Sequence, residues 1–73
     1  MKYAILISTD GPDCWGARSP DIDCIFSAGA TREEAVEGFR EALEIYLKDM
    51  KEMGKEPPEP TTDFEFIEVM DVA

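Results

Sequence analysis

The sequence predicts an α+β fold (β-β-β-α-β), in which a three-stranded antiparallel meander is followed by one long helix and a fourth strand. Three observations predict it. Short β-rich runs separated by turn residues occupy residues 1–29, a helical apolar stripe follows, and a second β-rich run comes after a proline-rich stretch. One sheet and one amphipathic helix bury their apolar faces against each other. We expect a single domain spanning residues 1–73.

The meander is expected to contain three strands, at residues 2–8, 14–19 and 23–29. The first, KYAILIS, has apolar residues on both alternating faces, which is typical of a central strand covered on one side and partly on the other. Glycine and proline in TDGPD set the turn after it, and Pro20 and Asp21 form the second turn.

The helix is expected to begin at Thr31 and to stop at Gly54. Thr31 and Glu34 have the spacing of a capping box, and Gly29 gives the backbone freedom at the strand-to-helix corner. Apolar residues at separations of three and four then form one wide stripe: Ala35, Val36, Phe39, Ala42, Leu43, Tyr46, Leu47, Met50 and Met53.

The chain after the helix is expected to return to the sheet. KEPPEP at 55–60 cannot be helical, so it is predicted as an extended, proline-stiffened connection. DFEFIEVM at 63–70 is predicted as the fourth strand. Its alternation changes phase between Phe66 and Ile67, which indicates a bulge or a strand with a partner on its second face.

Charge restricts the classes of partner. The chain has 17 acidic and 7 basic residues, a net charge of −10 and no histidine. Such a surface repels nucleic acid and anionic membranes. It favours a basic macromolecule, because complementary charge accelerates association and suppresses wrong partners. The alternative is that the acidity only keeps a small protein soluble.

Size and apolar content predict self-association. A 73-residue domain buries only somewhat more than half of its unfolded surface, and the strands have more apolar positions than one face needs. We therefore expect a homodimer or a higher homo-oligomer. The apolar runs are too short for a membrane span, and the N-terminus lacks a signal-peptide pattern, so a cytoplasmic location is expected.

The residue types offer little for catalysis, and we expect no catalytic residue, metal or cofactor. Cys14 and Cys24 are expected to be free thiols that act as small apolar residues. No histidine is present to activate a cysteine or serine. Two acidic pairs, Asp10 with Asp13 and Asp21 with Asp23, lie at opposite ends of the predicted hairpins and are interpreted as turn residues.

Four features occur in register along the chain: the first strand from Tyr3, the Pro20–Asp21 turn, the helix start and the prolines at 57–60. The most specific part is the helix start: Ser27, Gly29, Thr31, Glu34 and Ala35. Taken together, these features resemble the HicB-type antitoxin domain over nearly the whole chain. The resemblance implies a partial RNase H-like sandwich that is not a nuclease. It also implies a partner, a small basic HicA-type toxin that cleaves mRNA.

The sequence departs from the family pattern in three places. Asp23 and Cys24 replace the usual Pro-Gly after the turn, and Ala30 replaces a frequent aspartate. Many members continue into a DNA-binding module, and these residues include neither the helix-turn-helix nor the ribbon-helix-helix type. We therefore expect no direct nucleic-acid binding by this chain.

The leading hypothesis is an antitoxin-like binding protein that covers the active or RNA-binding surface of the toxin. Its predicted partner-binding residues are an aromatic anchor and five carboxylates: Trp15, Asp21, Asp23, Glu37, Glu41 and Glu44. Trp15 can equally belong to the core. The alternatives are a solitary self-associating domain without a toxin partner, and a metal-dependent RNase H-like hydrolase that uses the turn aspartates.

Overall fold

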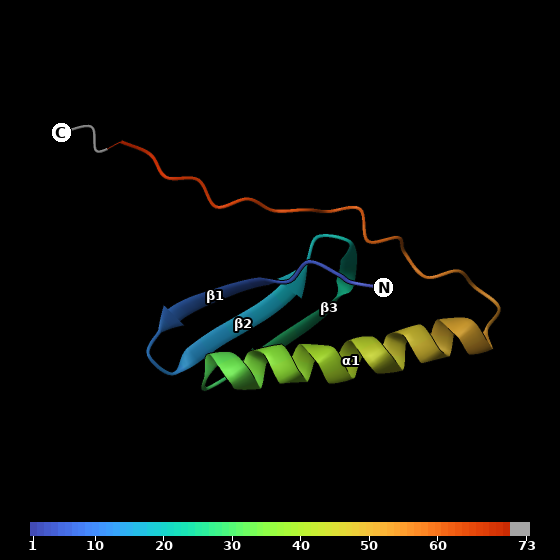
Figure 1. Cartoon of the computed structure of the whole chain (residues 1–73). Helices are drawn as coiled ribbons and strands as arrows, with labels where there is room; N and C mark the ends of the chain where they lie inside the picture. Colours follow the sequence, from blue (N-terminus) through green and yellow to red (C-terminus); the bar gives the residue numbers. More distant parts are fainter. Residues whose placement is uncertain (71–73) are drawn as a thin grey trace.

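The computed structural model describes residues 1–70 and consists of a three-stranded sheet with one long helix on one face (Figure 1). The elements in chain order are β1 (Leu6–Gly11), β2 (Cys14–Ser19), β3 (Ile22–Gly29) and α1 (Arg32–Glu52). The sheet order is β1-β2-β3 and both pairs are antiparallel. This architecture confirms the predicted α+β arrangement of a meander followed by a helix.

The two faces of the sheet differ in what covers them. Ile7, Ala17 and Ser27 lie opposite one another across the three strands on the face that α1 covers, and Ala17 is buried there. The next row, Leu6, Arg18 and Phe26, points to the other face. Phe26 is 72% exposed, so this second face is open to solvent.

The core forms where α1 crosses the helix-facing side of the sheet. Phe39 and Ala35 of the helix are fully buried. They join three buried sheet residues in one cluster, Ala17, Ile22 and Ile25. The buried helix residues are four apart, as the apolar stripe predicts. Tyr3, Ile5, Trp15, Ala42, Leu43 and Tyr46 pack around this cluster.

The corner between β3 and α1 is held by side-chain caps. Thr31 is the N-cap residue, and its hydroxyl accepts a hydrogen bond of 3.1 Å from the Glu34 N–H. The Glu34 carboxylate accepts a 2.9 Å hydrogen bond from the Ala30 N–H, one residue before the N-cap. Two N–H groups at the helix start therefore have partners.

Gly29 is required at this corner by a close approach. Its φ is not positive, so the expected backbone freedom is not the reason for glycine here. A Cβ at position 29 would lie 2.7 Å from the Glu34 Cβ and 2.9 Å from the Ala35 nitrogen. At the other end of α1, Gly54 has φ +73°, and its N–H donates to the Lys51 carbonyl, which ends the helix where the sequence predicts.

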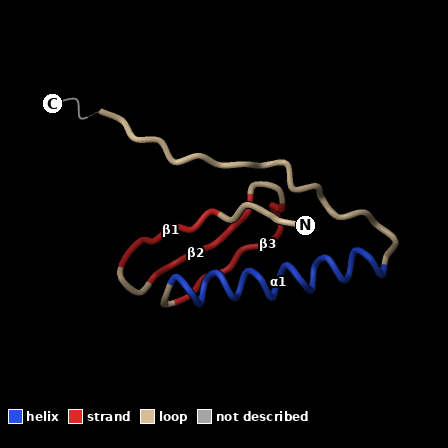
Figure 2. The backbone as a smooth tube through the Cα atoms, in the orientation of Figure 1, coloured by secondary structure: helices blue, strands red, loops and turns tan. Residues whose placement is uncertain are grey.

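The chain after α1 runs back along the sheet as an extended segment without strand pairing (Figure 2). We call residues 63–70 the C-terminal segment. The fourth strand expected there is not among the strands of residues 1–70. The strand expected at 2–8 is found at Leu6–Gly11 and lies at an edge of the sheet. Since a strand forms only where its backbone finds a partner, the C-terminal segment stays extended but unpaired.

Asp21 ties the residues before this segment to the β2–β3 turn. Its Oδ1 accepts hydrogen bonds from the hydroxyls of Thr62 (2.7 Å) and Thr61 (3.2 Å), and its Oδ2 accepts one of 3.1 Å from the Thr62 N–H. The hydrogen bond from the Thr62 hydroxyl contributes most to lowering the pKa of Asp21, against the opposing effect of desolvation. Tyr3 adds a second tie, because its hydroxyl donates to the Pro58 carbonyl at 2.6 Å.

Replacement of Gly29 by alanine is expected to destabilise the protein by about 1–3 kcal/mol, because the new methyl group would overlap backbone and Cβ atoms of α1. Gly11→Ala is the matched control, since a Cβ at that position meets nothing within 4 Å. The measurement is the urea midpoint of each variant. Equal midpoints for the two variants would contradict the close approach.

The tie at Asp21 is expected to depend on pH in one direction. The native state lowers the pKa of Asp21 below 3.8, so the tie is intact above that value and is lost as the pH falls through the lower native pKa. The amide resonance of Thr62 should therefore titrate below pH 3.8 in NMR spectra. Asp21→Asn should remove this titration and Asp13→Asn should preserve it. A Thr62 titration that survives in Asp21→Asn would refute the assignment.

Candidate partner-binding surface

The outer side of α1 carries a row of exposed carboxylates. Glu37, Glu41 and Glu44 are separated by four and three residues, which places them on one face of the helix, and all three are exposed. Glu37 forms an exposed ion pair of 3.4 Å with Arg40. Such a pair contributes little to stability, so the Glu37 carboxylate can exchange Arg40 for a basic group of another protein at little cost.

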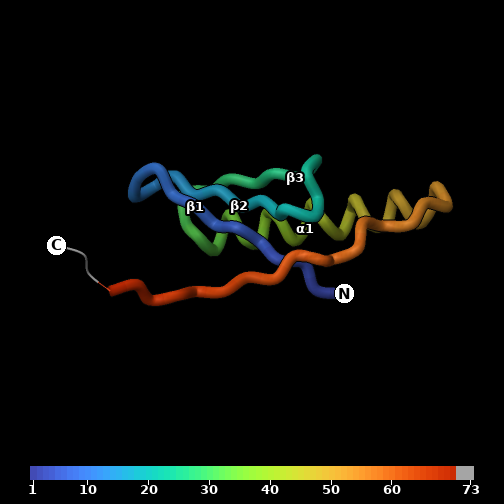
Figure 3. The backbone as a smooth tube through the Cα atoms, turned by 90° about the horizontal axis from the view of Figure 1, so that it is seen from above, coloured from blue at the N-terminus to red at the C-terminus, as the bar shows by residue number. Residues whose placement is uncertain are grey.

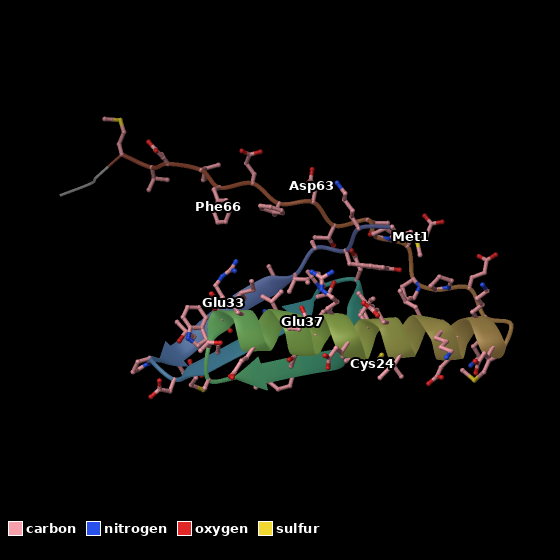
Figure 4. The ribbon with its side chains drawn as sticks, turned by 60° about the horizontal axis from the view of Figure 1, so that its bottom comes forward. Met1, Cys24, Glu33, Glu37, Asp63 and Phe66 are labelled. Atoms are coloured by element: carbon pink, nitrogen blue, oxygen red, sulfur yellow. The ribbon has the colours of Figure 1, made fainter. Side chains whose placement is uncertain are left out.

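Asp23 lies at the start of β3, next to the middle of α1. The pKa of Tyr46 on the helix is raised, first by its interaction with the neighbouring Cys24 side chain, then by desolvation and by the nearby Asp23 carboxylate. The thiol and the carboxylate therefore both lie near Tyr46. Figure 4 shows Cys24 beside the helix. Asp23 itself is exposed. It adds a further carboxylate near the helix, contributed by the sheet.

The other two predicted partner-binding residues have contacts within the protein. The carboxylate of Asp21 accepts hydrogen bonds from Thr61 and Thr62. Trp15 lies opposite Thr9 and Gly29, is half-buried and packs against the core cluster. The structure therefore leaves Asp23 and the three helix glutamates exposed for a partner, whereas Asp21 and Trp15 also support the fold.

The sequence interpretation did not identify an exposed apolar surface on the C-terminal segment. Five of its side chains are 65–89% exposed: Phe64, Phe66, Ile67, Val69 and Met70. A groove of about 570 Å³ separates the start of the segment from residues 4–7, with Trp15 and Arg32 also in its wall. Figure 4 shows Phe66 on the extended segment, apart from α1. The phase change after Phe66 was the available signal, because it indicated a strand with two covered faces.

The described part of the chain offers binding surfaces more than reactive centres. Within residues 1–70, no three Cys, Asp or Glu side chains are placed to hold a metal ion. Cys14 and Cys24 are free thiols, as the sequence predicts, and both are exposed. The same residues include no helix with the length and apolar character of a membrane span.

Comparison with known proteins identifies the family. The profile described as "HicB_like antitoxin of bacterial toxin-antitoxin system" matches residues 3–71. The UPF0150 protein Ta0767 of Thermoplasma acidophilum is 28% identical over 58 residues, which are 80% of this chain and 84% of that protein. No solved structure gives a significant match. The match covers the meander, the capped helix and the proline-rich return, and so the chain belongs to the HicB-like antitoxin family of bacterial toxin–antitoxin systems.

Proposed function

We propose that this chain neutralises a small basic HicA-type toxin by covering its active or RNA-binding surface. Membership of the antitoxin family supports a toxin as the partner. The observation that carries the proposal further is the row of exposed glutamates on the outer face of α1, on a chain with a net charge of −10. A protein that cleaves mRNA must attract phosphates, so its substrate surface is basic.

The acidic surface suits this role because carboxylates can take the places of RNA phosphates. Glu37, Glu41 and Glu44 project from one rigid helix, so their spacing is fixed before the toxin arrives. Long-range attraction between the two proteins accelerates their encounter, and the attraction is screened over about 8 Å at physiological salt. Arg40 next to Glu37 is then released from a weak exposed pair at little cost.

In this role the chain performs no catalytic step and acts in the cytoplasm, where mRNA is the target of the toxin.

The competing hydrolase hypothesis relies on the turn aspartates. Asp21 is engaged by Thr61 and Thr62, while Asp10 and Asp13 flank the other turn of the meander. Two-metal and one-metal hydrolases need convergent carboxylates, so binding is the function that the geometry supports best. The exposed C-terminal segment also supports self-association as a second property.

The test is binding to the small basic protein encoded in the neighbouring reading frame. Replacing Glu37, Glu41 and Glu44 by glutamine should weaken binding about 10- to 100-fold at physiological salt, mainly through slower association. The matched control neutralises three acids elsewhere: Asp13→Asn, Glu56→Gln and Glu59→Gln. Surface plasmon resonance at several salt concentrations measures both rates.

Two results would overturn this proposal. The first is absence of binding by the unaltered chain even at low salt. The second is an equal loss of affinity in the helix variant and the control variant, because net charge alone would then explain the attraction. Affinity that falls with rising salt and depends on the helix acids supports it.

A further inference from the structure

The C-terminal segment has the properties of a strand without a sheet. It is extended, and Phe66 is 89% exposed. The interactions of its side chains are local: the Phe64 N–H donates to the Asp63 carboxylate, and the Phe64 and Phe66 rings meet edge to face at 5.6 Å. Exposed apolar surface concentrated in one short segment marks an interaction site.

The strand β1 has the complementary property, an edge without a neighbour. It is the terminal strand of the sheet, so one row of its N–H and C=O groups is unpaired within the described sheet. Edge strands are commonly protected by lysine or proline, and LISTDG contains neither. The run from Tyr3 to Ile7 is apolar on both faces, which is typical of a strand with neighbours on both sides.

The ties before the segment fix where it starts, near the N-terminal end of β1, and leave residues 63–70 unpaired. The hydrogen bonds of Pro58 and Thr62 fix the chain at the N-terminus and at the β2–β3 turn. The prolines at 57, 58 and 60 stiffen the stretch between them. Beyond Thr62 the segment runs in the direction of β1 but apart from it (Figure 3). The 570 Å³ groove is lined by residues 4–7 on one side and residues 62–66 on the other.

The radius of gyration is larger than that of a compact domain, because the C-terminal segment does not pack on the sheet of its own chain. The radius of gyration is 14.9 Å. A compact domain of this length has a radius of gyration of about 11 Å. The excess reflects the extended chain, because the sheet and α1 pack closely (Figure 1).

We propose that two copies of this chain exchange their C-terminal segments, so that residues 63–70 of each copy become the fourth strand beside β1 of the other. This inference extends the self-association included in the proposed function. A second copy is the occupant that the structure favours, because each chain holds both a free strand and a free edge. A two-fold symmetric pair satisfies both at once.

The apolar surface that the exchange would bury is close to that of a stable protein–protein interface. Five apolar side chains from each copy would bury on the order of 1,000 Å², which approaches the size of specific interfaces before the backbone pairing is counted. Both copies carry a charge of −10, so they repel at low salt. The exchange should therefore strengthen as salt rises, opposite to the behaviour expected of toxin binding.

The first experiment measures mass by sedimentation equilibrium in a Cys14→Ser, Cys24→Ser background. The expected result is twice the mass of one chain, with a dimer fraction that increases with salt. Phe66→Asp with Ile67→Asp should yield monomers with unchanged helical circular dichroism, because both side chains are exposed in a single copy. Glu65→Gln with Glu68→Gln is the matched control in the same segment and should remain dimeric.

The second experiment distinguishes exchange from closure within one chain. Ser8→Cys in β1 and Val69→Cys in the segment are placed in the same chain, again without Cys14 and Cys24. A short bismaleimide should join two chains if the segments are exchanged. Crosslinks confined to single chains, or an unaltered protein that stays monomeric at all concentrations, would overturn the exchange. A dimer that survives Phe66→Asp with Ile67→Asp would also overturn it.

The two proposals fail separately. A dimer with crosslinked segments that does not bind the basic neighbour supports the exchange and contradicts the antitoxin function. If the unaltered chain is monomeric and the two aspartate substitutions abolish binding of the basic neighbour, the segment docks on that partner instead and the exchange is wrong.

Discussion

The packing of α1 on one face of the sheet holds this small protein together, and Phe39 is at its centre. The buried residues are few: Ala17, Ser19, Ile22, Ile25, Ala35 and Phe39. A single helix can cover only one side of three strands, and the rest of the structure follows from that restriction. The corner at Gly29 must be tight for the helix to fold back, and the opposite face and the C-terminal segment are left without cover.

Local signals in the sequence predicted most of the elements. β2 coincides with the expected residues 14–19, and β3 begins one residue before the expected 23. The helix was predictable at both ends, because Thr31, Glu34 and Gly54 act on their immediate neighbours. The bounds of β1 were less accurate, because its position depends on pairing with β2 and its apolar residues extend without interruption from Tyr3 to Ile7.

The parts that sequence reasoning missed depend on residues far apart in the chain. The partners of Asp21 lie 40 and 41 positions away, so its use as a tie was invisible to local patterns. Trp15 was ambiguous for the same reason, because the core cluster that it packs against combines residues of the sheet and of the helix. The helix acids were simpler, since the 3.6-residue period alone places Glu37, Glu41 and Glu44 on the outer face. The expected fourth strand must pair with the edge of a sheet, and residues 63–70 do not pair with the sheet in the described part of the chain.

These features divide the surface between two kinds of contact. The carboxylates along α1 face solvent on a rigid element and suit a basic partner, whereas the apolar C-terminal segment suits a neutral strand edge. The central claim is that the chain blocks an RNA-cleaving toxin. The most direct measurement is the rate of RNA cleavage by the basic neighbour as this chain is titrated into it at low salt. Cleavage is expected to stop at a fixed stoichiometric ratio of the two proteins, and cleavage that continues in excess of this chain would contradict the antitoxin function.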